Sequence, residues 1–298
     1  MGKSSSAARG EVFSTVCTTV TALPSRARDR SGSPGESELF IEFDGQQLVV
    51  RTDVPAVQEF LTDAFHNMLS ETVTHEAGRL GVFAHGDDFR IDSAESAEII
   101  GGEIEYLLNL VKAEVRIQFM RVRRVLLWLH AAAVERDGTA MLLAGPSGQG
   151  KSTLTSLLCR RGWRMMSDDV APVRMDRNEV VSFCQTPVMR IPRDRVLEPH
   201  KRVGLVRHRV ELAPHELRQG PAPIRSIGFL AFSPGSSLIV TRLTKGETAL
   251  ELLRNSINLV DHKAAAVARA AELAQGLLGV SLSYGSSAEA ADLLDSMV

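Results

Sequence analysis

The sequence predicts an α/β fold with a mixed sheet, preceded by a small α+β unit. The first observation is an apolar run at 140–144 that leads through a glycine-rich loop into a helical stretch at 152–161. The second is that further apolar runs at 164–167, 227–232 and 280–284 alternate with helical patterns. Strands that alternate with helices in the sequence typically form a sheet covered by helices, which is the α/β arrangement.

The composition excludes several classes of protein. The 298 residues include 34 basic and 36 acidic side chains, a net charge of −2, so we expect no nucleic-acid partner. No apolar run approaches the roughly 20 residues that span a bilayer, so we expect no membrane partner. The cysteines Cys17, Cys159 and Cys184 are widely spaced and odd in number. That usage favours the cytoplasm and argues against a disulfide framework or a zinc site.

Residues 1–37 and 38–120 differ in composition. Residues 1–37 are rich in Ser, Arg, Gly and Pro, so we expect a disordered or weakly ordered tail. Residues 38–120 are interpreted as a small α+β accessory domain, because Asp44 and Gly45 predict a hairpin turn and Pro55 opens an amphipathic helix. Its expected elements are strands at 39–43, 47–50, 81–84 and 89–91, a helix from 55, and a helix over 94–117.

Residues 121–298 are interpreted as a second, larger domain built around the glycine-rich loop. A hairpin turn at 135–138 and a capping box at 244–247 are its clearest local signals. The expected strands are 125–133, 140–144, 164–167, 170–175, 180–184, 227–232, 237–243 and 280–284, and the expected helices are 152–161, 244–253, an Ala-rich stretch before 280 and a short C-terminal one.

The glycine-rich loop is a complete phosphate-binding motif. From Gly145 to Thr153 the chain reads Gly-Pro-Ser-Gly-Gln-Gly-Lys-Ser-Thr, which matches G-x-x-x-x-G-K-[ST]. Glycines let several backbone N–H groups face one polyphosphate, and the N-terminus of the next helix favours an anion. We therefore expect bound ATP, with Lys151 at the β- and γ-phosphates and the Ser152 hydroxyl on Mg²⁺. The expected nucleotide-binding residues are Gly145, Ser147, Gly148, Gln149, Gly150, Lys151, Ser152 and Thr153.

Asp168 and Asp169 follow the expected strand at 164–167, with Asp169 18 residues past Lys151. Phosphoryl transfer needs a carboxylate to hold Mg²⁺ and a group to accept the proton of the attacking hydroxyl. The two aspartates together supply candidates for both tasks. The alternative is an Asp-Asp turn between two strands.

His130 is a third candidate, because it lies in the apolar run that leads by a hairpin into the loop. On its own, a histidine in such a strand is more often a hydrogen-bonded core residue than a catalytic one. Only the combination with the two aspartates makes His130 a candidate for the site.

Three segments together resemble the catalytic core of the HPr kinase/phosphorylase family. They are 129–133, which reads Leu-His-Ala-Ala-Ala, the loop at 142–153, and 161–169, which reads Arg-Gly-Trp-Arg-Met-Met-Ser-Asp-Asp. Members of this family are bacterial protein-serine kinases with a fold similar to that of phosphoenolpyruvate carboxykinase. The resemblance implies a P-loop kinase core with a mixed sheet for residues 121–298, which makes this the catalytic domain.

The resemblance also implies a role for each candidate. Lys151 contacts the phosphates and Ser152 binds Mg²⁺. Asp169 takes the proton of the substrate hydroxyl, and Asp168 assists on the metal side. His130 acts beside Asp169, either orienting it or tuning its pKa.

The chain also departs from the family at several points, and it has no counterpart to the Arg-rich segment tied to the phosphorylase reaction. Thr153 stands where the family usually has an acidic residue, and 186–192 replaces a Gly-rich stretch that carries a further metal-binding Glu. Residues 39–120 do not resemble the regulatory N-terminal domain of HPr kinases. We therefore interpret the chain as a related kinase whose acceptor need not be HPr.

The expected function is ATP- and Mg²⁺-dependent transfer of the γ-phosphoryl group to a serine hydroxyl of a peptide or protein. Because HPr kinases are hexamers, a homo-oligomer is expected by analogy. Two alternatives stay open. A metabolite kinase would need a closed pocket beside Asp169, and a nucleotide-binding regulatory protein would need Lys151 but not Asp169.

Overall fold

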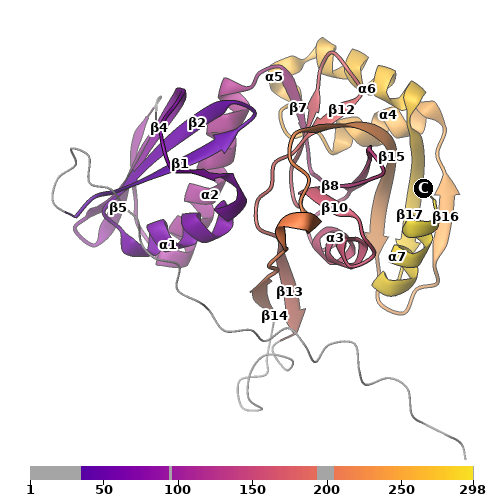
Figure 1. Ribbon diagram of the computed structural model, residues 1–298, viewed down its shortest axis with the longest axis horizontal. Helices are drawn as coiled ribbons and strands as arrows, with labels where there is room; N and C mark the ends of the chain where they lie inside the picture. Colours follow the sequence, from indigo (N-terminus) through magenta and orange to yellow (C-terminus); the bar gives the residue numbers. More distant parts are fainter. Residues whose placement is uncertain (1–34, 94–95, 193–204, 298) are drawn as a thin grey trace, which may run out of the picture.

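The computed structural model describes residues 35–93, 96–192 and 205–297, and within them the chain is α/β with mixed sheets (Figure 1). A six-stranded sheet forms the N-terminal part, in the order β3-β1-β2-β4-β5-β6, and helices α1 and α2 pack against it. Its elements are β1 (Ser37–Phe43), β2 (Gln46–Thr52), α1 (Pro55–Ala64), the 3₁₀ turn η1 (His66–Met68), β3 (Leu69–Ser70), β4 (Glu76–His85), β5 (Asp88–Asp92), β6 (Ala97–Ile100) and α2 (Ile104–Val122).

A nine-stranded sheet forms the larger part, along the path β10-β8-β9-β15-β12-β11-β7, with β17 on β15 and β16 on β17. Strands β9, β15 and β17 run parallel, and the other neighbouring strands along this path pair antiparallel, as do β16 and β17. The strands are β7 (Leu126–Leu129), β8 (Ala131–Arg136), β9 (Thr139–Ala144), β10 (Arg164–Ser167), β11 (Ala171–Arg174), β12 (Glu179–Val181), β15 (Pro221–Phe232), β16 (Ile239–Arg242) and β17 (Leu278–Tyr284).

Among the described residues after 122, five α-helices and a separate hairpin accompany this sheet. Helices α3 and α7 pack together beside the sheet, and α4 packs on α6 (Figure 1). The helices are α3 (Lys151–Cys159), α4 (Lys245–Arg254), α5 (Leu259–His262), α6 (Ala264–Gly276) and α7 (Ser287–Ser296); the 3₁₀ turn η4 is Pro214–Glu216; the hairpin is β13 (Val188–Pro192) with β14 (Leu205–Arg209).

The turns predicted from local sequence are confirmed. At the β1–β2 turn, Asp44 and Gly45 have φ values of 48° and 73°, and at the β8–β9 turn Asp137 and Gly138 have 50° and 81°. Two successive positive φ values are typical of the tight turn that matches strand twist, and Asp-Gly tolerates them. The capping box that opens α4 is also present, since the Thr244 side chain accepts a hydrogen bond from the N–H of Glu247.

Two predicted elements are wrong in part. The helix expected over 94–117 begins only at Ile104, because 97–100 forms the edge strand β6 on β5 and Gly101-Gly102 separates strand from helix. The single strand expected over 125–133 is two strands, β7 and β8. Strand β7 pairs with β11 whereas β8 pairs with β9 and β10, so the chain bends at His130 between them.

The central strands are apolar throughout because both of their faces are buried. In β8, Ala131 and Ala133 contact the α6 side of the sheet while Ala132 and Val134 contact the side covered by α3 and α7. Strand β9 alternates in the same way. A strand buried on both faces gives a continuous apolar run, which is the pattern that precedes the glycine-rich loop. The loop and α3 therefore follow directly from a strand that is packed on both faces.

A cluster of aromatic rings joins the six-stranded sheet to the larger one. Phe43 and Phe119 from the N-terminal part contact Phe183, with ring centroids 5.0 and 6.0 Å apart, and Trp128 lies 5.3 Å from Phe183. Phe65 completes the cluster at 6.4 Å. All of these side chains belong to one buried core. Aromatic pairs at such distances and edge-to-face angles add to the stability that burial provides.

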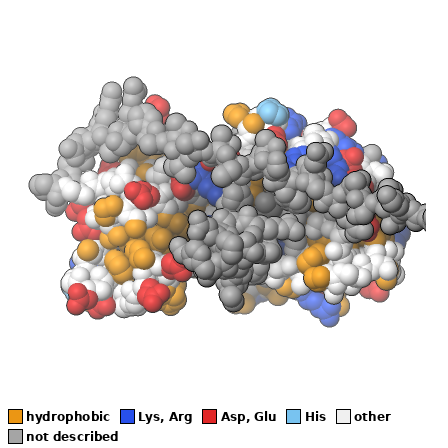
Figure 2. Space-filling view, turned by 90° about the horizontal axis from the view of Figure 1, so that it is seen from below, with side chains coloured by type: hydrophobic (Ala, Val, Ile, Leu, Met, Phe, Trp, Pro, Cys, Tyr) orange, Lys and Arg blue, Asp and Glu red, His pale blue; other side chains and the backbone are white. Residues whose placement is uncertain are grey.

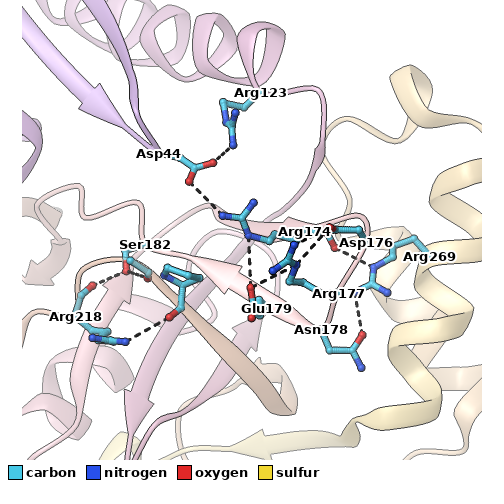
Figure 3. Close-up of polar contacts among 12 residues, drawn as sticks. Asp44, Arg123, Arg174, Asp176, Arg177, Asn178, Glu179, Ser182, Arg218 and Arg269 are labelled. Atoms are coloured by element: carbon cyan, nitrogen blue, oxygen red, sulfur yellow. Dashed lines mark hydrogen bonds and ion pairs between the residues drawn. The ribbon is translucent and has the colours of Figure 1, made fainter. Parts of the chain in front are cut away.

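An ion-pair network lies at the same joint (Figure 3). Asp44, in the β1–β2 turn, accepts a hydrogen bond from Arg123 at the end of α2 and lies 3.4 Å from Arg174 on β11. Glu179 on β12 lies 3.6 Å from Arg174. The turn of the N-terminal hairpin is thereby tied to the larger sheet.

The division of the chain at residue 120 stays a prediction. Residue 120 falls inside α2, two residues before its end. The expected tail at 1–37 lies outside the described residues except for its last three, and Ser37 already begins β1. In Figure 2, Lys and Arg side chains lie mainly toward the centre and right of the visible face, whereas Asp and Glu side chains lie on both sides. In the described part of the chain, no helix is both long and apolar enough to cross a membrane.

Glu135 gives a test of the β8–β9 hairpin. Its buried carboxylate accepts hydrogen bonds from Arg164 and from the N–H of Gly138. Burial alone would raise the pKa of Glu135. The two hydrogen bonds lower the pKa by more than burial raises it, so the net pKa lies below its ordinary value. We expect Glu135→Gln to reduce the free energy of unfolding by about 1–3 kcal/mol at pH 7.

The pH dependence follows from the sign of that shift. Because the pKa of Glu135 is lower in the folded than in the unfolded protein, its carboxylate stabilises the fold at pH values above the ordinary pKa of Glu. This contribution is lost as the pH falls through the pKa of Glu135 in the folded protein. The difference between wild type and variant in urea unfolding should therefore shrink at acid pH. The control is Glu76→Gln, which breaks a surface ion pair with Arg79 and should change stability by less than about 0.5 kcal/mol. Equal losses in both variants would contradict this account.

Candidate active site

The glycine-rich loop adopts a conformation that requires its glycines. Gly145, Gly148 and Gly150 have φ values of 153°, 90° and 86°. Residues with a Cβ rarely adopt such values. A Cβ on Gly145 would also lie 3.0 Å from the carbonyl oxygen of Leu230. The loop ends at Lys151, the first residue of α3, whose leading N–H groups have no partner within the helix and are suited to an anion.

Two distant strands hold the loop in place. The Gln149 side chain accepts a hydrogen bond from the N–H of Phe232 on β15, at 2.6 Å. The Tyr284 hydroxyl, from β17, donates to the carbonyl of Gln149 at 2.7 Å. A Cβ on Gly150 would collide with that hydroxyl. The side chain of Gln149, predicted as a nucleotide ligand, is thus directed at the scaffold, and Tyr284 is a supporting residue that no local pattern indicated.

Lys151, His130 and Asp169 form one chain of contacts. The Lys151 ammonium donates to the carbonyls of Gly145 and Pro146, at 2.7 and 3.3 Å, and lies 2.9 Å from Nε2 of His130. Nδ1 of His130 lies 3.7 Å from Oδ1 of Asp169. An ammonium only donates, so Nε2 must accept and the proton of the neutral ring must sit on Nδ1, facing Asp169. The structure thus brings together three residues predicted from separate segments.

The electrostatics of these groups agree with that tautomer. Burial, followed by the Lys151 charge, lowers the pKa of His130, so the ring is neutral at pH 7. Burial also lowers the pKa of Lys151, against the attraction of Asp169 and Asp168. Burial would raise the pKa of Asp169, but the charge of Arg116, with that of Lys151, outweighs this effect and lowers the pKa. Asp169 is therefore ionised, and its side chain is 35% exposed, so it is reachable from solvent.

Asp168 and Ser152 have the character of a metal site. Asp168 is buried, and burial raises its pKa to about 6, while a hydrogen bond with Ser152 opposes the rise. Among the described residues, Oδ1 of Asp168 has no hydrogen-bond partner. A buried carboxylate oxygen without a donor is costly unless a cation or proton binds it. Mg²⁺ is usually bound by one or two protein oxygen ligands together with substrate phosphates and water. The Asp168 carboxylate and the Ser152 hydroxyl therefore fit that ion.

No group of three or more His, Cys, Asp or Glu side chains in the described ranges is arranged to hold a metal ion. A metal at Ser152 and Asp168 would thus depend on the nucleotide for further ligands. The remaining loop residues, Ser147, Gly148 and Thr153, lie at the surface or half-buried around the same turn.

Arg116 and Gln185 are residues of this site that the sequence did not indicate. Arg116, on α2, lies 2.9 Å from Oδ2 of Asp169, and its guanidinium also donates to the side chain of Gln185, which follows β12. The charge of Lys112, one turn earlier on α2, opposes the rise in the pKa of Asp168 that burial causes and helps to lower the pKa of Asp169. Within the sequence, these cations are only the polar positions of an amphipathic helix, and nothing in the spacing points to the aspartates.

Comparison with known proteins gives limited similarity. Residues 102–187 match the family described as SynChlorMet cassette protein ScmC. This is less than half of the chain, and the segment runs from the start of α2 past Gln185. No curated protein matches. Among solved structures, the HPr(Ser) kinase/phosphatase from Coxiella burnetii is similar to 57% of this chain and 92% of its own, with 12% identity and a TM-score of 0.28. A TM-score that low carries no argument about fold or activity.

Gly150 tests the support of the loop by Tyr284. We expect Gly150→Ala to weaken binding of Mg-ADP by about tenfold or more, because of the positive φ and the collision with the hydroxyl. The double variant with Tyr284→Phe should recover part of the loss, since only the collision is relieved. The control is Gly138→Ala, which has a similar φ of 81° but open space around its Cβ and lies outside the loop. Calorimetry that shows no difference between Gly150→Ala and Gly138→Ala would overturn this role for Tyr284.

Asp168 tests the metal site. Mg²⁺ should strengthen ADP binding in wild type. We expect the factor by which it does so to be about tenfold or more smaller in Asp168→Asn, because the amide lacks the charge that the ion needs. Binding of ADP in excess EDTA should be unchanged. The metal-free variant should unfold at the same temperature as wild type or higher, since no charge is buried. A full Mg²⁺ enhancement in the variant, measured by titration calorimetry, would rule out Asp168 as a ligand.

Proposed function

We propose that this protein is an ATP- and Mg²⁺-dependent kinase that transfers the γ-phosphoryl group to a serine hydroxyl of a peptide or protein. The observation that carries the proposal is that His130 lies between Lys151 and Asp169, 2.9 Å from the Lys151 ammonium and 3.7 Å from Oδ1 of Asp169. His130 thus connects a phosphate-binding loop to an ionised and accessible carboxylate. A protein that only bound a nucleotide would have no need of an ionised, accessible carboxylate near its phosphate-binding loop.

On the donor side, the loop supplies positive charge and N–H groups. Lys151 would leave the carbonyls of Gly145 and Pro146 for the β- and γ-phosphates, which are stronger acceptors. Ser152 and Asp168 would hold Mg²⁺, which when bound neutralises charge on the phosphates. His130 stays neutral and keeps the ammonium directed at the phosphates. The contribution of these residues is positioning and charge compensation.

On the acceptor side, Asp169 is the general base. Its Oδ1 accepts the hydroxyl proton while the acceptor oxygen forms a bond to the γ-phosphorus. The bond between that phosphorus and the β–γ bridging oxygen breaks, and ADP leaves with the electron pair. Because Asp169 is ionised and its neighbour Asp168 is engaged by Ser152, the two carboxylates have separate tasks.

The choice of a serine on a polypeptide rests on the resemblance of the three core segments to protein-serine kinases. The partial exposure of Asp169 supports it, since a large acceptor has to reach the base from outside. A metabolite kinase would instead enclose its acceptor.

The test is transfer of label from [γ-³²P]ATP in lysate and on peptides encoded beside the gene. Wild type should label a polypeptide on serine. Asp169→Asn should bind Mg-ATP normally but lose about 10²–10⁴-fold in transfer rate, because the base is missing. Lys151→Ala should lose nucleotide binding as well. The control is Asp292→Asn, which breaks an exposed ion pair with Arg161 and should transfer at the wild-type rate.

Each other outcome favours a different function. Label in a small molecule would indicate a metabolite kinase. Full cellular function in Asp169→Asn with none in Lys151→Ala would indicate a nucleotide-dependent regulator.

A further inference from the structure

We infer that Arg116 is a positioning residue for Asp169, so that helix α2 of the N-terminal part completes the active site. The inference rests on the proposed function, in which Asp169 is the base. It adds that the six-stranded sheet and its helices are required for catalysis itself, because one of their side chains sets the orientation of the reacting carboxylate.

Helix α2 presents two different faces. Val111, Val115 and Phe119 are fully or almost fully buried in the core that the N-terminal part shares with the larger sheet. Lys112 and Arg116 are four residues apart, and positions four apart share a face of a helix. Both act on the aspartates at the end of β10, since Arg116 is an ion-pair partner of Asp169 and Lys112 lowers the pKa of both carboxyls. The apolar face therefore fixes where this cationic face points.

The guanidinium of Arg116 is held at two sides. Nε and one terminal nitrogen donate to Oε1 of Gln185, at 2.9 and 2.6 Å. The other terminal nitrogen lies 2.9 Å from Oδ2 of Asp169. Gln185 is 2% exposed, and the next residue, Thr186, bonds to the carbonyls of Asp63 and Ala64 at the end of α1. The planar guanidinium of Arg116 thus bridges the side chains of Gln185 and Asp169, with donors on two of its edges.

This arrangement assigns a task to each oxygen of Asp169. Oδ2 is engaged by Arg116. Oδ1 lies 3.7 Å from Nδ1 of His130, which is too long for a hydrogen bond. Oδ1 is therefore the oxygen left for an acceptor hydroxyl, and Arg116 prevents the carboxylate from rotating to offer Oδ2 instead. A lysine would keep the charge but could not bridge Gln185 and Asp169 with a rigid fork.

The competing explanation is that the ion pair between Arg116 and Asp169 only holds the N-terminal part against the larger sheet. A second arginine on the same helix provides a matched control. Arg123, at the end of the same helix, pairs with Asp44 in the network of Figure 3. It ties α2 to the same joint but does not contact Asp169. If Arg116 only held the two parts together, the loss of either arginine would have the same kind of effect.

The experiment compares Arg116→Ala, Arg116→Lys and Arg123→Ala in phosphoryl transfer by the full chain. Arg116→Ala should lower kcat by about 10- to 100-fold, because a misplaced base is no longer aligned with the hydroxyl, while KM for Mg-ATP changes less than about twofold. Added guanidinium should restore part of kcat in Arg116→Ala and none in Arg123→Ala. Arg116→Lys should keep the stability of wild type but recover only a small part of the rate.

Several results would overturn the inference. They are an unchanged kcat in Arg116→Ala, full activity in Arg116→Lys, or an equal loss of kcat in Arg123→Ala. These outcomes leave the proposed function intact, because wild type still transfers phosphate and Asp169→Asn does not. If wild type transfers nothing, the proposed function fails, and a crystal structure of Arg116→Ala decides the inference. An Asp169 carboxylate that keeps its wild-type orientation there would refute it.

Discussion

Two adjacent carboxylates at the end of β10 are the constraint on which the rest of the structure depends. Asp168 is buried and Asp169 is half-buried, and like charges this close raise the cost of ionising both. The compensating charges are Lys151 at the start of α3 and Arg116 on α2, and the neutral ring of His130, at the bend between β7 and β8, lies between Lys151 and Asp169. Each of these elements has to be placed correctly for the pair to exist as observed.

The scaffold accounts for that placement. Alanine-rich strands β8 and β9, buried on both faces, fix the loop and the bend at His130 relative to each other. On the other side, the aromatic cluster around Phe183 and the bonds of Asp44 fix α2 against the larger sheet. The catalytic interpretation and the architecture are therefore linked, because a shift of either sheet would separate Arg116 from Asp169.

Much of the fold could be predicted because its signals are local. The Asp-Gly turns, the capping box at Thr244 and the glycine-rich loop each depend on a few neighbouring residues and their φ preferences. The errors arose where pairing partners decide. Residues 97–100 became a strand because β5 offers an edge, and 125–133 broke at His130 because its two halves pair with different strands. The role of 38–120 as a separate domain stays a prediction.

For the candidate site, the sequence by itself indicated the loop, Lys151, Ser152 and the two aspartates, because residue types at short spacing are enough to suggest their chemistry. It gave His130 only in combination with them. The tertiary structure alone decided that Arg116, Gln185 and Tyr284 belong to the same site. These residues come from a helix, a connecting segment and a strand far apart in the chain. Which side chains face one another across such distances depends on how apolar faces pack, and that packing leaves no local pattern in the sequence.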